Sequence, residues 1–319
     1  MGDLFLSRKF FRLSPPDSQP GPRNRLQPES NRINEVKTIR QALEQAVKVH
    51  QNGDLEKASH LYDKILLSYP RHPEALHLKG VIAYQKNDPQ LAEQLILEAI
   101  AINPEAAAYY YNLGEACRAQ RRYHKAGKAY LECIKRQPDY PNIYRRLGLL
   151  QHHCGKLDEA FSSYRKALRQ NQTDPVTLNN FGLLLLAFNK PEQAREAFSQ
   201  ALCINPQYGE ACHNLAISFT QQNLLEQALA CYRRTLNLAP DLPGVRRHYI
   251  RLLQNLCAWP EFEETLAELT RLTKHKQPLE ESPFLNLTYN DNPEQNLRIA
   301  EKWCKKMVDE ISIELNDYA

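Results

Sequence analysis

Glycine and long hydrophobic runs are both scarce in this sequence. Only 11 of the 319 residues are glycine, and none follows Gly244. Turns that bind a diphosphate need glycines so that the backbone can approach the phosphate closely, and the sequence has no G-x-G-x-x-G, P-loop or H-E-x-x-H motif. No apolar run reaches the length of about 18 residues that a membrane-spanning helix needs. We therefore predict no catalytic residue, no cofactor and no membrane span.

An excess of one charge is lacking as well. The 41 basic and 37 acidic side chains give a formal charge of +4. Residues 1–32 contain six basic and three acidic side chains, and so hold +3 of that charge. The rest of the chain is nearly neutral, which argues against nucleic acid as the partner.

The eight cysteines form no C-x-x-C pair. Free cysteine behaves as a small apolar side chain and stays reduced in the cytoplasm, so we predict a cytoplasmic chain without disulfides. No metal site is predicted, because the adjacent His152 and His153 point about 100° apart on a helix and cannot share one ion.

Alanine returns at a fixed spacing of 34 residues, at Ala58, Ala92, Ala126, Ala160, Ala194 and Ala228. A large apolar residue follows each alanine by four positions, at Tyr62, Ile96, Tyr130, Tyr164, Phe198 and Tyr232. A small residue keeps the same spacing, at Gly80, Gly114, Gly148, Gly182 and Ala216. Each unit therefore predicts two helices that approach closely at the small residues, with the large side chain filling the gap beside them.

These features resemble the tetratricopeptide (TPR) repeat, with its L-G element, A-x3-F pair and terminal proline. The resemblance implies an all-α superhelical solenoid, because one helical hairpin cannot bury its own apolar face and neighbours must stack. We predict a TPR array over residues 33–242, with six repeats at 39–72, 73–106, 107–140, 141–174, 175–208 and 209–242. Residues 1–32 are predicted to be a disordered tail, and residues 243–319 a C-terminal helical extension.

A turn is predicted between the two helices of each unit, beginning at position 15 of the repeat. Residues suited to a left-handed backbone stand there in five units, as Gly53, Asn87, Gly155, Asn189 and Asn223. Arg121 holds the same position in the third unit and does not share that preference. Five of the six units thus predict a left-handed turn residue at the same place.

The first helices of such a solenoid line its inner curve, so positions 2, 5, 6, 9, 12 and 13 of each repeat are predicted to face a groove for another polypeptide. Asparagine recurs at position 6, as Asn112, Asn180 and Asn214. A side-chain amide offers a donor and an acceptor, so a column of amides can pair with the backbone of an extended peptide. The alternative is that asparagine merely suits a hydrated groove. The predicted peptide-binding residues are these three with Tyr111, Arg145, Arg146, Asn179, His213, Arg247 and Arg251.

Basic residues on these first helices add a second pattern, made of Arg145, Arg146, Arg247, His248 and Arg251. Such residues favour acidic segments of a partner when they act together, and have no such meaning when they are scattered in solvent. The sequence leaves both interpretations open.

The repeat pattern continues beyond Pro240 for one more helix, predicted over 244–256. Cys257, Trp259 and Pro260 then replace the expected turn, and a further helix is predicted over 261–273. The last predicted helix spans 293–315, with an apolar seam of Leu297, Ala300, Cys304, Met307, Ile311 and Leu315. This seam is a candidate homodimer interface.

Two short elements after the repeats resemble one enzyme family. The segments 248–264 and 281–303, with Cys257-Ala258-Trp259 and Ser282-Pro283-Phe284 in them, are similar to the junction that follows the TPR array in SPINDLY-type protein O-GlcNAc transferases. Ala258 departs from the acidic residue usual in that family. The resemblance implies the acceptor-recognising part of a glycosyltransferase whose catalytic region is missing or separately encoded. The main interpretation is a scaffold that is not an enzyme and that binds a protein or peptide segment.

The N-terminal tail contains a short mixture of apolar and basic residues, made of Leu4, Phe5, Leu6, Arg8, Lys9, Phe10, Phe11, Arg12 and Leu13. A frayed tail and a basic amphipathic helix on a membrane surface or a partner are the two interpretations.

Overall fold

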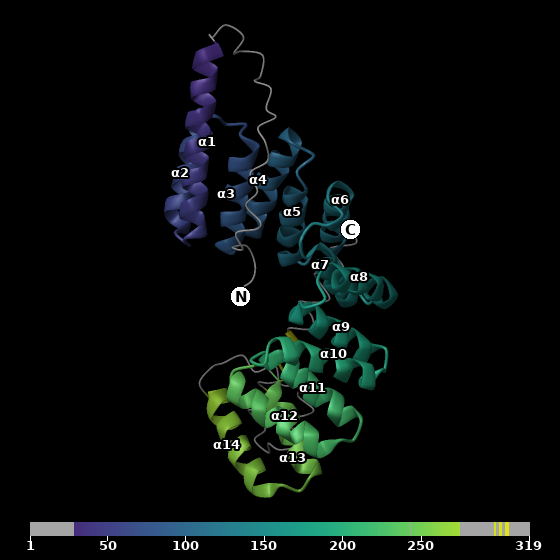
Figure 1. Ribbon diagram of the computed structural model, residues 1–319. Coiled ribbons are helices and arrows are strands. Elements are labelled where there is room, and N and C mark those ends of the chain that lie inside the picture. The colour runs from purple at the N-terminus through teal and green to yellow at the C-terminus, as the bar shows by residue number, and fades with distance from the viewer. Residues whose placement is uncertain (1–28, 243, 275–296, 298–299, 302–303, 306–319) are drawn as a thin grey trace. The chain divides into compact units, whose positions relative to one another are not determined.

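A computed structural model describes residues 29–242 and 244–274, together with 297, 300–301 and 304–305. The described part holds fourteen helices and no strand (Figure 1). They are α1 Glu29–Gln51, α2 Leu55–Ser68, α3 Pro73–Gln85, α4 Pro89–Ile102, α5 Ala107–Ala119, α6 Tyr123–Arg136, α7 Ile143–His153, α8 Leu157–Gln170, α9 Pro175–Ala187, α10 Pro191–Ile204, α11 Gly209–Gln221, α12 Leu225–Leu238, α13 Val245–Asn255 and α14 Trp259–Lys274. The predicted all-α repeat fold is confirmed.

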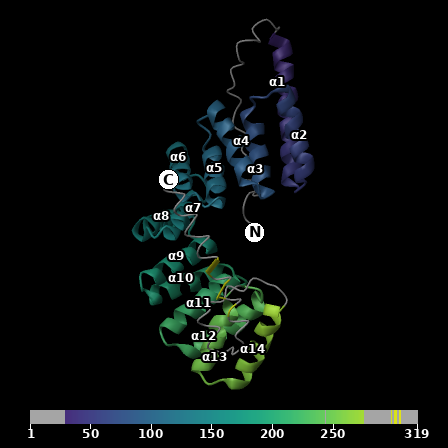
Figure 2. The ribbon, with the colours of Figure 1, turned by 180° about the vertical axis from the view of Figure 1, so that it is seen from behind.

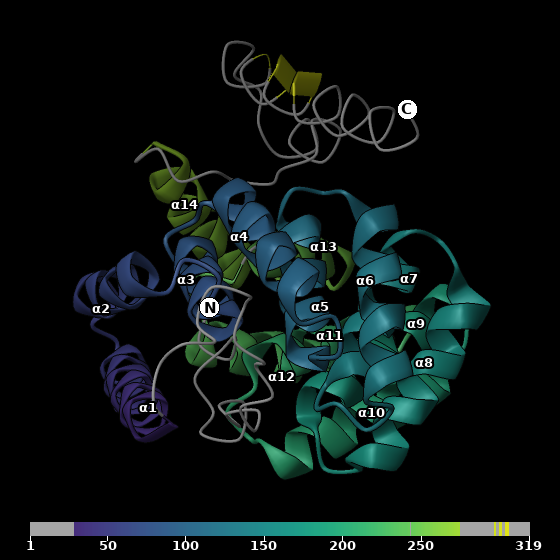
Figure 3. The same cartoon turned by 90° about the horizontal axis from the view of Figure 1, so that it is seen from above.

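The helices pair along the chain, α1 with α2 through α13 with α14, and the pairs fall into two compact units. The first unit ends at Pro141 and contains α1–α6, and the second begins at Asn142 and contains α7–α14. Within each unit, successive pairs stack side by side in chain order (Figures 1, 2 and 3). In the part of the chain described, no helix combines the length and apolarity that crossing a bilayer requires.

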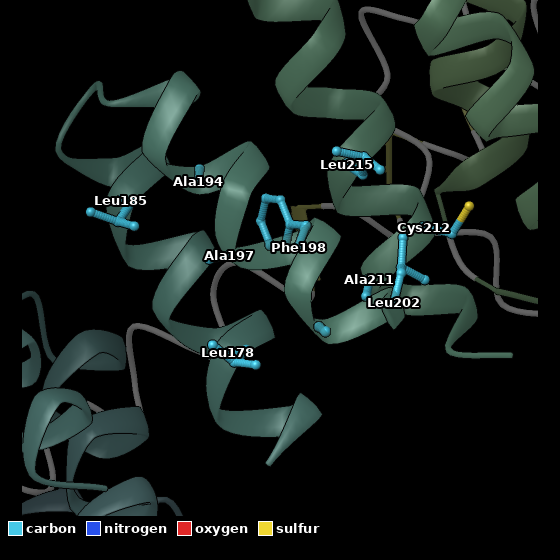
Figure 4. Packing of buried hydrophobic residues seen from close by; sticks show 10 residues of the cluster. Leu178, Leu185, Ala194, Ala197, Phe198, Leu202, Ala211, Cys212 and Leu215 are labelled. Atoms are coloured by element: carbon cyan, nitrogen blue, oxygen red, sulfur yellow. The ribbon is translucent and has the colours of Figure 1, made fainter. Parts of the chain in front are cut away.

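The positions that recur in the sequence form the cores of the pairs. All six recurring alanines have no exposed surface, and the large apolar residues that follow them are buried as well. In one such cluster, the ring of Phe198 lies between side chains of its own pair, such as Leu178 and Ala194, and Leu215 of the next helix (Figure 4). The neighbouring pairs therefore share one continuous apolar contact rather than each closing a core of its own.

The glycines at position 8 allow this contact. A Cβ atom on Gly114 would lie 2.5 Å from Cδ1 of Tyr130 and closer still to Cε1. A Cβ on Gly182 would lie 2.8 Å from Cζ of Phe198 in the same way. The ring at position 24 thus packs directly on the backbone of the first helix, which leaves no room for a side chain there.

The turn at position 15 is left-handed in every pair. Besides the glycines and asparagines predicted there, Arg121 has a φ of 59° and Cys257 a φ of 53°. A left-handed backbone costs a residue with a Cβ roughly 1–2 kcal/mol, so the packing of the helices imposes this conformation on both residues. Local preference could not have predicted it at either position.

The predicted end of the repeat pattern at Cys257 is wrong. The turn before α14 was expected to be replaced, yet the amides of Cys257 and Ala258 donate to the carbonyls of Gln254 and Leu253 at 3.1 and 3.0 Å. The preceding turn has the same two bonds, from Asn223 to Thr220 and from Leu224 to Phe219. The helices α13 and α14 therefore form a seventh pair with the turn geometry of the other six.

Near the ends of the chain, the predicted boundaries can be compared with the structure only at the described residues. Helix α1 begins at Glu29, a few residues before the predicted end of the tail at residue 32. Residues 1–28, the Ser282-Pro283-Phe284 element and most of the predicted helix 293–315 lie outside the described residues. Of the predicted seam, Leu297, Ala300 and Cys304 are described and helical, and the dimer interface stays a prediction.

We expect Gly114→Ala to lower the free energy of unfolding by about 1–3 kcal/mol, because the added methyl group overlaps the Tyr130 ring. Gly80→Ala is the comparison variant and should lose less, since its Cβ would meet the Cγ1 methylene of Ile96 at 2.8 Å and the Ala92 carbonyl oxygen at 3.2 Å, whereas the Cβ on Gly114 would overlap several atoms of a ring more deeply. Urea unfolding of both variants measures the difference. Equal losses for the two would contradict the packing argument.

Candidate binding surface on the first helices

The first helices of successive pairs contact one another within each unit. These contacts join α3 with α5 in the first unit, and α7 with α9, α9 with α11, and α11 with α13 in the second. Successive second helices make no comparably extensive contact in the described part of the chain. The first helices therefore lie on the inner side of each unit, and we call positions 2, 5, 6, 9, 12 and 13 of these helices the inner face.

Polar side chains on the inner face link several of the first helices to the next one. In the first unit, His50 Nε2 donates to Gln85 Oε1 at 2.7 Å, and the Asn112 amide donates to His77 Nε2 at 2.7 Å. The partners in each bond are 35 residues apart, which is one repeat plus one residue. A residue at one position therefore meets the next position of the following repeat, and each such bond contributes about 0.5–1.5 kcal/mol.

The side chain of Asn112, a predicted peptide-binding residue, is used in this hydrogen bond to His77. It is only 9% exposed, and its Oδ1 and the Nδ1 of His77 are buried without a partner among the described residues. Burial, and secondarily His50, lowers the pKa of His77 to about 3, so this imidazole is neutral at physiological pH. Asn112 therefore stabilises the contact between α3 and α5, and the peptide-holding role predicted for it needs the link to open.

Tyr111 is also enclosed, since its ring lies 5.1 Å from that of Tyr140 and 6.3 Å from that of Tyr130. Beside them, Glu115 has no exposed surface and accepts hydrogen bonds from Arg118 at 3.0 Å and from the Tyr130 hydroxyl. The burial of Glu115 in the core was not predicted. A signal was present, because Glu115 stands at position 9, where the other units of the array have Val or another aliphatic residue.

In the second unit, the predicted amides remain partly open. Asn180 and Asn214 are half-buried, and the Asn214 amide donates to Oδ1 of the buried Asn179 at 2.9 Å. No hydrogen bond to the Asn180 side chain is present among the described residues. This unit therefore presents two amides at equivalent positions of adjacent first helices, and Asn179 fixes the orientation of one of them.

The predicted basic residues differ in their surroundings. Arg145 is half-buried and forms an ion pair with Asp174 at 3.3 Å, while Arg146 is only 9% exposed. Arg247 is half-buried and Arg251 is exposed, on the same helix α13. The structure thus brings Arg247 and Arg251 together on α13 and Arg145 and Arg146 together on α7.

His213 joins α11 to α13 through a bond between two imidazoles. Its Nε2 lies 2.9 Å from Nδ1 of His248, and the Tyr232 ring packs against both. Burial lowers the pKa of each histidine to about 4, with further contributions from His248 and Arg247 at His213, and from Arg247 and Arg251 at His248. The prediction named His213 for peptide binding and did not foresee that it holds two first helices together.

The spacing of polar residues in the sequence could have predicted these hydrogen bonds. Polar residues stand at position 5 of one repeat and position 6 of the next in His77 and Asn112, Asn179 and Asn214, and His213 and His248. A search for pairs 35 residues apart would have found all three. No group of three or more His, Cys, Asp or Glu that could hold a metal ion exists within the described ranges, and all eight cysteines are free.

Comparisons with known proteins agree with this architecture. Tetratricopeptide repeat models match residues 43–107, 97–141, 111–175 and 185–243, which together cover more than half of the chain. Among solved structures, PilF from Pseudomonas aeruginosa superposes with a TM-score of 0.59 at 20% identity, over 74% of this chain and 99% of PilF. The type IV pilus biogenesis factor PilW gives 0.59 at 16% identity, over 64% of this chain and 95% of PilW. The APC/C Cut9–Hcn1 structure gives 0.59 at 16% identity, over 70% and 45%.

At these identities the structural likeness shows the fold alone. No curated protein matches the chain significantly.

The low pKa of His77 predicts a pH-dependent stability. Its folded pKa of about 3 lies below the ordinary 6.5, so the unfolded state alone takes up a proton as the pH falls from 6.5, and the stabilisation present above 6.5 is lost. We expect the native chain to lose about 1–2 kcal/mol more than His77→Gln between pH 7 and pH 5.

Urea unfolding at the two pH values measures this difference. His60→Gln, which removes an exposed histidine, should behave as the native chain does. Parallel pH profiles for the native chain and His77→Gln would show that His77 is protonated equally in both states.

Proposed function

Because the chain belongs to the tetratricopeptide repeat family, we propose that it is a protein interaction scaffold that binds an extended segment of another protein along its first helices. The observation that carries this proposal is the pair of half-buried amides, Asn180 and Asn214, at position 6 of α9 and α11. No catalytic role is proposed for any residue.

The spacing of these amides suits an extended chain. Packed helices lie about 8–10 Å apart, and an extended peptide advances about 3.3 Å per residue. Successive first helices therefore meet the backbone of a bound segment about once in three residues. An amide at each helix can accept from a peptide N–H and donate to a peptide carbonyl, whatever side chains the segment carries.

Apolar residues on the same face supply a second kind of contact. Leu149, Leu183 and Ile217 stand at position 9 of α7, α9 and α11, and all three are half-buried. Side chains of the bound segment that point toward the helices would cover them, and burying apolar area contributes about 25 cal/mol per Å². Each of these helices thus offers a backbone contact at position 6 and, one turn further along the helix, an apolar contact at position 9.

We expect the double variant Asn180→Ala/Asn214→Ala to weaken peptide binding about tenfold or more, because two backbone hydrogen bonds are lost. The probe is the tightest binder selected with the full chain from a phage-displayed library of random peptides, measured by isothermal titration. Asn237→Ala, at an exposed position of the second helix α12, is the control and should bind as the native chain does.

Two results would overturn the proposal. One is a library that yields no binder to the full chain, and the other is a set of binders whose affinity is the same for the double variant and the native chain. Since both amides are partly exposed and the position-6 substitutions leave the apolar core intact, circular dichroism should show unchanged helix content.

A glycosyltransferase fragment is the second candidate, and it rests on the sequence elements after the repeats. Of these, Cys257 is exposed with a left-handed backbone, and Trp259 is 52% exposed with its ring edge-on to Phe262 at 5.8 Å. An exposed tryptophan at the start of α14, in the last described pair, suits a surface that another part of a protein covers.

This candidate predicts that the gene continues beyond codon 319 into a region encoding nucleotide-binding folds. Sequencing the gene and its transcript past that codon tests it. A resumed reading frame with glycine-rich nucleotide-binding turns would favour the enzyme, and unrelated sequence would remove this candidate while leaving the scaffold proposal intact.

A further inference from the structure

The inner faces of the two units differ in charge. In the first unit, the acidic residues on this face each accept from a nearby donor: Glu44 from Arg40, Glu74 from Tyr109 and Glu115 from Arg118, at 2.9 to 3.0 Å. In the second unit, the inner face carries Glu210 as its only acidic residue against a larger basic set. That set, which we call the basic face, consists of four arginines that carry the charge, Arg145, Arg146, Arg247 and Arg251, and of the histidines His152, His153, His213 and His248.

Four residues of the basic face lie close together on α13 and α11. Arg247 and Arg251 are one helical turn apart on α13, and the bonded pair of His213 and His248 lies beside them. After burial, the positive charge of Arg247 is among the causes that lower the pKa of both histidines, and Arg251 adds to the effect at His248. The electrostatic potential at this place is therefore positive even while both imidazoles are neutral.

The histidine pair also provides a directional donor. Each neutral imidazole has one N–H, and one of these two N–H groups is used in the bond between the rings. The other N–H must then lie on a nitrogen at the outer end of the pair, on His213 or on His248 according to the tautomer. Two guanidinium groups and one imidazole N–H together suit a carboxylate, which accepts several hydrogen bonds at once.

Charge complementarity on this face favours one class of partner. We propose that the inner face of the second unit binds an acidic segment of a partner protein, with aspartate or glutamate carboxylates against Arg247, Arg251 and the His213–His248 pair. This inference rests on the proposed function and adds the chemistry of the bound segment.

The remaining residues of this face favour a peptide over a nucleic acid. Amides at Asn180 and Asn214 and aliphatic side chains at Leu183 and Ile217 accompany the basic residues on α9 and α11. No Phe, Tyr or Trp occupies an inner-face position of α7, α9, α11 or α13, and single-stranded nucleic acids are commonly held by stacking on such rings.

Two fluorescein-labelled peptides of about twelve residues test the proposal, since four first helices at about three residues each require this length. One carries glutamate at every third position in an alanine–serine background, and the other carries glutamine at the same positions. Fluorescence anisotropy with the full chain at low salt should show the glutamate peptide binding about tenfold or more tighter, with the difference shrinking as salt is raised.

Substitutions then locate the site. Arg247→Gln/Arg251→Gln should abolish the preference for the glutamate peptide. The control, Arg165→Gln/Arg169→Gln, removes two exposed arginines with the same spacing from the second helix α8, and should keep the preference. Arg247→Glu/Arg251→Glu should transfer the preference to a peptide with lysine at those positions, a gain that misfolding cannot produce.

The outcomes separate this inference from the proposed function. Equal affinity for the glutamate and glutamine peptides, or failure of the glutamate peptide to bind, would overturn acid selectivity, while binders weakened by Asn180→Ala/Asn214→Ala would still support a peptide-binding scaffold. A preference unchanged by Arg247→Gln/Arg251→Gln would also overturn the assignment. Tighter binding of a single-stranded oligonucleotide of equal charge, weakened by the same variant, would identify nucleic acid as the partner instead.

Discussion

The close contact between a backbone and a ring underlies the whole structure. Where Gly114 faces Tyr130, the two helices of a pair meet without any intervening side chain. The ring then extends beyond its own pair and packs toward the next one, as Phe198 does toward Leu215. A pair that lost this contact would lose its inner packing and its bond to its neighbour together, so the stability of one repeat depends on the repeats around it.

The polar links on the first helices depend on that packing. His77 and Asn112 can hydrogen-bond only because the apolar contacts bring α3 and α5 side by side. The same positions that face the proposed partner therefore also hold the array together, and the two tasks compete for the same side chains. In the second unit the competition is relaxed at Asn180, because Arg145, at position 5 of the preceding repeat, pairs with Asp174 instead.

The period of the sequence was enough to predict the pairs, their core residues and most of the turns. Ala194 and Phe198 could be placed in the core from spacing alone, because every unit repeats the same pattern. Arg121 and Cys257 could not be placed in left-handed turns, since tertiary packing overrides their own backbone preference. A seventh pair was missed for the same reason.

The candidate site was harder to predict than the fold. Positions on the inner face follow from the period, but the exposure of Asn112 depends on which residue the preceding repeat places beside it, and His77 fills that place. The basic residues on α13 were visible in the sequence, whereas their position around a bonded histidine pair required the packing of α11 on α13.

These links also bear on how such an array can change over generations. An imidazole meets an amide between α3 and α5, two amides meet between α9 and α11, and two imidazoles meet between α11 and α13. These three junctions thus have different matching pairs, so deleting a repeat between two of them would bring together side chains that are not partners in this structure. The order of these repeats therefore matters to the polar contacts between them.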